Sequence, residues 1–266
     1  MNGVKTLPNV VFLFALTVCV GCTGQLTPQA KKLLESSWAS YKAGDDAATI
    51  EKLNGFLEAN AKSPQADEAY YLRGLARHRR KELDGAKADL QTAFDRSKDK
   101  QLRAKAAVAL GELAFEADDM ALAENMYRRA LSEAEADKEP ADQAYYRLGC
   151  VLQRQGRWEQ ADAQFDRLDY LFPKSELAKL AGRKIRCTAW THQAGSFSDK
   201  SRADAEAKRL KERNLPAESK SIAQDGRLVH VVQVGRFATY EQAAAAVGKT
   251  KQHQADAFIT VTRQTR

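Results

Sequence analysis

The sequence contains little proline, cysteine and histidine. Only six prolines occur among its 266 residues, and this scarcity favours long helices because proline breaks a helix interior. The four histidines do not show the spacing of a zinc site: His78, His192, His230 and His253. Neither a Gly-x-Ser-x-Gly elbow nor a phosphate-binding loop is present. The sequence therefore predicts a protein with no catalytic residues, no metal and no cofactor.

A long hydrophobic run is also missing. The most apolar segment, residues 10–20, is interrupted only by Thr17, and it is shorter than the roughly 20 apolar residues that span a bilayer. Lys5 precedes the segment, and Cys19-Val20-Gly21-Cys22 ends it. A positive charge followed by a short apolar run is typical of a secretory signal peptide.

The four residues Cys19-Val20-Gly21-Cys22 resemble the bacterial lipobox. This resemblance implies a signal peptide over residues 1–21, cleavage before Cys22 and a diacylglyceryl group on the Cys22 sulfur. Each buried CH₂ of such chains stabilises membrane binding by about 0.8 kcal/mol. Thr23, where aspartate would be the retention signal, implies the periplasmic face of an outer membrane, and residues 22–30 would form a tether. The alternative is an ordinary signal peptide with incidental cysteines.

Two further cysteines, Cys150 and Cys187, would remain in the mature chain. Neither has a histidine or cysteine at metal-ligand spacing. They could pair as a disulfide in an oxidising compartment, or Cys150 could simply fill a small apolar position in a helical core.

Basic residues are concentrated toward the C-terminus. Residues 23–186 contain 28 basic and 27 acidic residues, whereas residues 187–266 contain 13 and 8. The excess could attract an anionic partner or could serve solubility alone.

Residues 28–186 contain an internal repeat. Gly74, Gly111 and Gly149 lie 37 and then 38 residues apart, and each is followed by an alanine and then a large residue at the same spacings. These partners are Ala86 and Leu90, Ala123 and Tyr127, and Ala161 and Phe165. A degenerate copy precedes them, with Ser37 at the glycine position. Periods of this length indicate stacked helix pairs.

Each repeat predicts two helices that approach closely at the glycine, while the large residue fills the gap between pairs. Polar breaks at 42–45, 81–84, 116–119 and 155–157 predict the turns. The repeats resemble the tetratricopeptide repeat. That resemblance implies an all-α solenoid with a capping helix at 173–186 and a concave groove for an unidentified protein partner. A basic cluster in one helix favours a solvated face: Arg73, Arg77, Arg79, Arg80 and Lys81.

Residues 187–266 follow another pattern. Gln193–Phe197 and Gln233–Phe237 both read Gln-x-Gly-x-Phe, and each leads from a predicted strand into a predicted helix, at 199–213 and 239–252. Further strands are predicted at 216–223 and 257–262, with an Asp-Gly hairpin turn between the second and third strands. The order β-α-β-β-α-β predicts a small α+β ferredoxin-like domain with one sheet face open.

The paired motifs resemble the SPOR (sporulation-related repeat) domain, which implies binding of peptidoglycan glycan strands that have lost their stem peptides. Gln193, Ser196 and Gln233 would supply hydrogen bonds, and Arg227 and Arg236 would meet lactyl carboxylates. Trp190 or His192 would stack on a sugar ring. The second motif departs from the family pattern, in which an aromatic residue and arginines in the strand and a proline before the phenylalanine are usual. Those places hold His230, Val231, Gln233 and Arg236 here.

The resemblances together imply an envelope lipoprotein that scaffolds a protein and binds the cell wall during remodelling or division. An alternative is a periplasmic adaptor whose C-terminal domain docks to protein. An RNA-recognition module shares the strand order, but its aromatic strand motifs are absent here and export removes access to RNA, so no nucleic-acid partner is expected.

Overall fold

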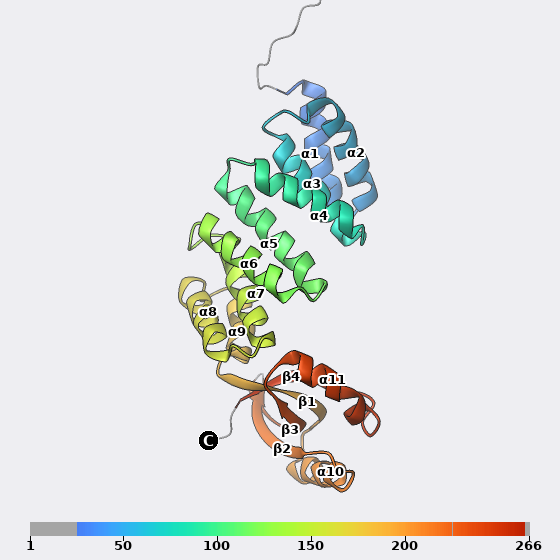
Figure 1. Ribbon diagram of the computed structural model, residues 1–266, viewed down its shortest axis with the longest axis vertical. Helices are drawn as coiled ribbons and strands as arrows, with labels where there is room; N and C mark the ends of the chain where they lie inside the picture. The colour runs from blue at the N-terminus through green and yellow to red at the C-terminus, as the bar shows by residue number, and fades with distance from the viewer. Residues whose placement is uncertain (1–25, 225, 264–266) are drawn as a thin grey trace, which may run out of the picture.

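The protein is described by a computed structural model for residues 26–224 and 226–263. The predicted signal peptide, the lipobox with Cys19 and Cys22, and the start of the tether lie outside these residues. The molecule is elongated, with a helical array along most of its length and an α/β domain at the C-terminal end (Figure 1). The predicted fold class, a helical solenoid followed by a ferredoxin-like domain, is confirmed.

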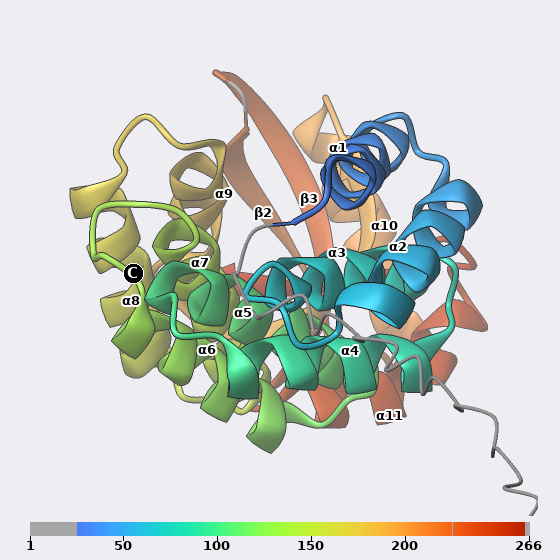
Figure 2. The ribbon, with the colours of Figure 1, turned by 90° about the horizontal axis from the view of Figure 1, so that it is seen from above.

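The array consists of four antiparallel helix pairs and a terminal helix. The pairs are α1 (Pro28–Lys42) with α2 (Asp46–Asn60), α3 (Ala66–Arg79) with α4 (Leu83–Arg96), α5 (Lys100–Glu116) with α6 (Met120–Glu133), and α7 (Ala141–Arg154) with α8 (Trp158–Leu171). The terminal helix is α9 (Glu176–Lys184). Seen along the long axis, the pairs follow an arc from α1 to α9, with the first helix of each pair on the inner side (Figure 2).

The repeated glycines allow the two helices of a pair to touch. A Cβ atom on Gly149 would lie 2.4 Å from the Phe165 ring, and one on Gly111 would lie 2.6 Å from the Tyr127 ring. Each large residue therefore packs directly over the glycine of its own pair. This corrects our expectation that it fills the gap between pairs, because the helices approach more closely than a side chain at the glycine position would permit.

Ion pairs join the basic cluster of α3 to neighbouring helices. Asp89 of α4 accepts from Arg73 at 2.6 Å and from Arg77 at 2.7 Å, and its side chain is only 5% exposed. Arg79 pairs with Asp46 of α2, which links adjacent helix pairs. The basic cluster therefore joins helices through ion pairs. Only its outermost residues form the solvated face that we expected.

The C-terminal domain contains a four-stranded antiparallel sheet of order β2-β3-β1-β4. Its elements are β1 (Cys187–Phe197), α10 (Lys200–Glu212), β2 (Ala217–Gln224), β3 (Arg227–Phe237), α11 (Tyr240–Lys251) and β4 (Phe258–Arg263). The small core under α10 joins Ala194, Val232 and Val234 of the sheet to Ala207 and Leu210 of the helix. Burial of these apolar side chains holds the helix against one face of the sheet.

The two parts of the molecule are joined without a flexible linker. Only two residues separate α9 from β1, and Gln153 of α7 bonds to both sides of the junction. Its Nε2 donates to the Lys184 carbonyl at 2.9 Å, and its own carbonyl accepts from Trp190 Nε1 at 2.9 Å. Arg263 of β4 donates to the Gly182 carbonyl at 2.9 Å. The C-terminal domain therefore sits in a defined position against the end of the array.

Both described cysteines are free thiols. Burial raises the pKa of Cys150 and Cys187, so both thiols stay protonated at neutral pH. The disulfide that the sequence left open is not formed. Within residues 26–224 and 226–263, no helix combines the length and the apolar character needed to cross a bilayer.

Candidate binding groove on the uncovered sheet face

Strand alternation sorts the side chains of the C-terminal domain onto two faces. His192 and Ala194 of β1 point toward the helices, where His192 Nε2 lies 2.9 Å from the Ala243 carbonyl of α11. Gln193, between them, points to the other face. Its partners in the register are Gln233 of β3 and Phe258 of β4, which share that face. Both helices of the domain pack on the first face and leave the second uncovered.

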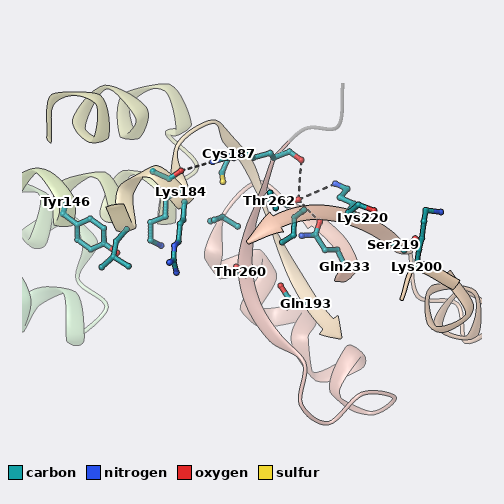
Figure 3. A pocket seen from close by; sticks show the side chains of 18 residues that line it. Tyr146, Lys184, Cys187, Gln193, Lys200, Ser219, Lys220, Gln233, Thr260 and Thr262 are labelled. Carbon is teal, nitrogen blue, oxygen red and sulfur yellow. Dashed lines mark hydrogen bonds between the residues drawn. The ribbon is translucent and has the colours of Figure 1, made fainter. Parts of the chain in front are cut away.

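The uncovered face forms the floor of a groove of ≈ 1000 Å³. The sheet contributes Gln193, Gln233, Thr260 and Thr262 to it, and the edge strand β2 adds residues 219–223. The opposite side is formed by the end of the helical array, where Tyr146 of α7 and part of α9 line the groove (Figure 3). Hydroxyl and amide groups on this floor suit a ligand rich in hydroxyl and acetamide groups.

The charge of the groove has one sign. Five of the described residues that line it are basic and none is acidic, the basic ones being Arg183, Lys184, Lys200, Lys220 and Arg263. Two carboxylates outside the lining pair with these cations, Glu218 with Lys220 at 2.8 Å and Asp204 with Lys200 at 2.9 Å. Basic side chains that converge on a concave surface raise its positive potential and attract anions.

The sheet is strongly curved across the groove. Thr262 Oγ1 on β4 donates to Gln233 Oε1 on β3 at 2.7 Å, across the intervening strand β1. Lys220 Nζ on β2 lies 3.5 Å from the same Thr262 oxygen, and the three side chains point toward one another (Figure 3). In a flat sheet these edge strands would be about 14 Å apart, beyond the reach of a lysine. The uncovered face is therefore concave.

The expected site residues are placed in three different surroundings. Gln193 is half-buried and Gln233 is buried, and both line the groove. Ser196 is exposed near the end of β1, opposite Val231, outside the groove lining. Arg227 is exposed at the β2–β3 hairpin, and Arg236 donates to Thr188 Oγ1 at 3.0 Å. The structure thus brings the two glutamines together and leaves the serine and both arginines apart.

Trp190 and His192 lie away from the groove. His192 is 1% exposed, and its Nδ1 lies 2.8 Å from Thr250 Oγ1 beneath α11. Trp190 is 8% exposed, and its ring packs 5.1 Å from that of Tyr240 and 6.0 Å from that of Trp158. Their placement corrects our expectation that one of them stacks on a sugar ring, because alternation along β1 turns both toward the helices.

The groove contains residues that sequence reasoning missed. Lys220, Thr260 and Thr262 follow from strand alternation once the register is known. Phe258 is outside the groove lining, but it is 53% exposed and pairs with Gln193 in the register, on the same sheet face. The contribution of α7 and α9 had no signal in the sequence, because it depends on how the two domains meet. Among the described residues, no three His, Cys, Asp or Glu side chains are placed to hold a metal ion.

Comparison with family models assigns three segments of the chain. Residues 188–260 match the SPOR domain, residues 143–175 match a tetratricopeptide repeat, and residues 23–114 match a family described as outer membrane lipoprotein. The families matched are those of binding and scaffold domains. A search of curated proteins found no match.

Solved structures resemble the helical array. A tetratricopeptide repeat protein from Parabacteroides merdae is 19% identical with a TM-score of 0.50, and the match covers 59% of this chain and 58% of that chain. MamA is 19% identical over 58% of this chain and 81% of its own, with a TM-score of 0.46. YrrB, a repeat protein with an unusual peptide-binding site, is 18% identical over 58% of this chain and 76% of its own, with a TM-score of 0.44. At such identity the likeness to the first shows the fold alone.

Proposed function

Because this chain joins a tetratricopeptide-type helical array to a C-terminal SPOR domain, we propose that it binds stem-peptide-free glycan strands of peptidoglycan and holds a protein partner beside them. The observation that carries the proposal is the concave, basic groove on the uncovered sheet face. A stripped strand is a chain of hydroxyls, acetamides and lactyl carboxylates. The amide and hydroxyl floor and the basic walls complement those groups.

Within this proposal the predicted contacts are revised. Gln193 and Gln233 bind acetamide and hydroxyl groups from the floor of the groove, and Lys220 meets carboxylates from the β2 side. Phe258 replaces Trp190 and His192 as the surface on which a sugar ring stacks. Ser196, Arg227 and Arg236 take at most peripheral contacts, where a long strand leaves the groove.

The helical array supplies the second half of the proposed function. Its first helices form the inner side of an arc, the arrangement that solenoids use to bind extended partners (Figure 2). A lipid anchor at Cys22 would hold the protein at the periplasmic face of an outer membrane, in line with the lipoprotein family match over residues 23–114. The role would be non-enzymatic and would serve wall remodelling or division.

The glycan proposal is tested by co-sedimentation with sacculi, with and without amidase treatment. We expect amidase treatment to increase binding, because it creates stripped strands. Gln193→Leu replaces the amide with an apolar group, removes its hydrogen bonds and should reduce binding several-fold. Gln252→Leu is the matched control, since Gln252 is exposed at the end of α11 on the other side of the domain.

Two other outcomes would redirect the proposal. If deletion of residues 187–266 leaves binding to sacculi unchanged, the C-terminal domain docks to protein and the chain is a periplasmic adaptor. If incubation with sacculi releases muropeptides in a sustained way, the chain is an enzyme.

A further inference from the structure

The end of the helical array forms one side of the groove. Tyr146 of α7 and Leu180, Gly182, Arg183 and Lys184 of α9 line it, opposite the edge strand β2 (Figure 3). The bonds at the domain junction fix this wall, since Gln153 holds the Lys184 carbonyl and Arg263 holds the Gly182 carbonyl. The groove is thus composite, and its shape depends on both domains.

The array also contributes charge to the groove. Lys184 is half-buried and lies on the α9 side, whereas Lys220 and Lys200 lie on the far side of the concave sheet. Glu218 and Asp204 pair with the two lysines of the far side, so Lys184 adds a cation from the other domain to the path of an anionic strand. Charges on opposite sides of a concave surface act on the same ligand, so their attractions reinforce each other.

We propose that the terminal helix α9 is part of the glycan site, and that Lys184 selects strands whose lactyl groups are free carboxylates. The inference rests on the proposed glycan binding and extends it to a residue outside the SPOR domain. A free lactyl carboxylate is the chemical mark left when a stem peptide is removed. A cation from α9 therefore binds the free carboxylate, which stripped strands have and strands that still carry peptides lack.

Because α9 forms one side of the groove, ligand binding also couples the two domains. A ligand that touches both β2 and α9 bridges the junction and adds contacts between the array and the sheet. Binding should therefore slow hydrogen exchange in α9 as well as in the strands, because a ligand that binds only the folded arrangement stabilises it.

The test compares full-length variants on two forms of the same glycan. One form is amidase-stripped glycan, and the other is this glycan after chemical reduction of its lactyl carboxylates to alcohols. Lys184→Gln should weaken binding of the stripped form by about fivefold, the scale of one partly exposed charge contact, and should leave binding of the reduced form unchanged. Lys184→Arg keeps the charge and should keep the affinity.

Lys179→Gln is the matched control on the same helix. Lys179 pairs with Glu176 at 2.6 Å, does not line the groove and should have no effect on either glycan. If Lys184→Gln binds stripped glycan as well as wild type while Gln193→Leu does not, the role of α9 is overturned and the glycan site stands. If wild type binds neither glycan, both proposals fail together.

Discussion

The indole Nε1 of Trp190 donates to the backbone carbonyl of Gln153 at 2.9 Å, and this bond joins the first strand of the sheet to the last helix pair of the array. Both residues are buried, Gln153 to 1% exposure. A buried carbonyl that loses its donor is left unsatisfied, which costs about 1–3 kcal/mol. The bond is therefore a specific constraint on how the two domains meet.

Trp190→Phe should loosen the junction. The phenyl ring keeps part of the packing against Tyr240 and removes the donor to Gln153, so the free energy of unfolding should fall by about 1–3 kcal/mol. Hydrogen exchange at the start of β1 should become faster. Trp38→Phe is the matched control, because Trp38 donates to Glu68 at 2.9 Å at the far end of the array. Equal exchange at β1 in both variants would contradict this role.

Gly149→Ala should destabilise the fourth helix pair. The added methyl group would lie 2.4 Å from the Phe165 ring, and overpacking of this kind costs about 1–3 kcal/mol. Gly55→Ala in α2 is the control, since a Cβ there meets nothing within 4 Å. That substitution should stabilise α2 by up to about 1 kcal/mol through helix propensity. Thermal unfolding of both variants measures the change in stability. A loss of stability of similar size in both variants would contradict the role of Gly149.

Asp89→Ala should cost more than the loss of an ordinary surface pair. Asp89 is buried and accepts from both Arg73 and Arg77, so its removal takes the most buried anionic partner from two guanidinium groups at once. We expect a loss of about 2–4 kcal/mol in chemical denaturation. The comparison is Asp67→Ala, which removes a more exposed pair with Arg96 and should cost under about 1 kcal/mol.

The stability of the C-terminal domain should fall in acid through His192. Burial lowers the pKa of this imidazole below its usual 6.5, so the native state favours the neutral ring. Its contribution is present above pH 6.5 and is lost as the pH falls through the lowered pKa. Tryptophan fluorescence can follow unfolding between neutral and mildly acidic pH. His192→Gln should reduce the slope of stability against pH, and an unchanged slope would show that other groups cause it.

The array could be predicted closely from sequence because its contacts are local and repeated. The spacing of Gly74, Gly111 and Gly149 fixes the pairs, and polar breaks mark the turns where the helices end. The strand order of the C-terminal domain also followed from its duplicated motif. These features depend on residues near one another in the chain, and short-range pattern is what a single sequence displays.

The groove could be predicted only in part. Gln193 and Gln233, chosen because each begins a Gln-x-Gly-x-Phe motif, do line the groove, whereas Trp190 and His192, one of which was expected on the open face, are both buried on the other side. A shift of one residue in a strand exchanges its two faces, and the bulges in β1 and β3 make that register hard to infer. Lys184 could not be found at all, since its role depends on a contact between domains.

The position of α9 limits how this molecule can change in length. The same helix closes the solenoid, accepts hydrogen bonds from both Gln153 of α7 and Arg263 of β4, and borders the groove. An extra helix pair inserted between α8 and α9 would move Tyr146 and Gln153 of α7 away from the groove and the junction, whereas one inserted near α2 would leave both in place. Growth or loss of repeats is therefore compatible with the groove only toward the N-terminal end of the array.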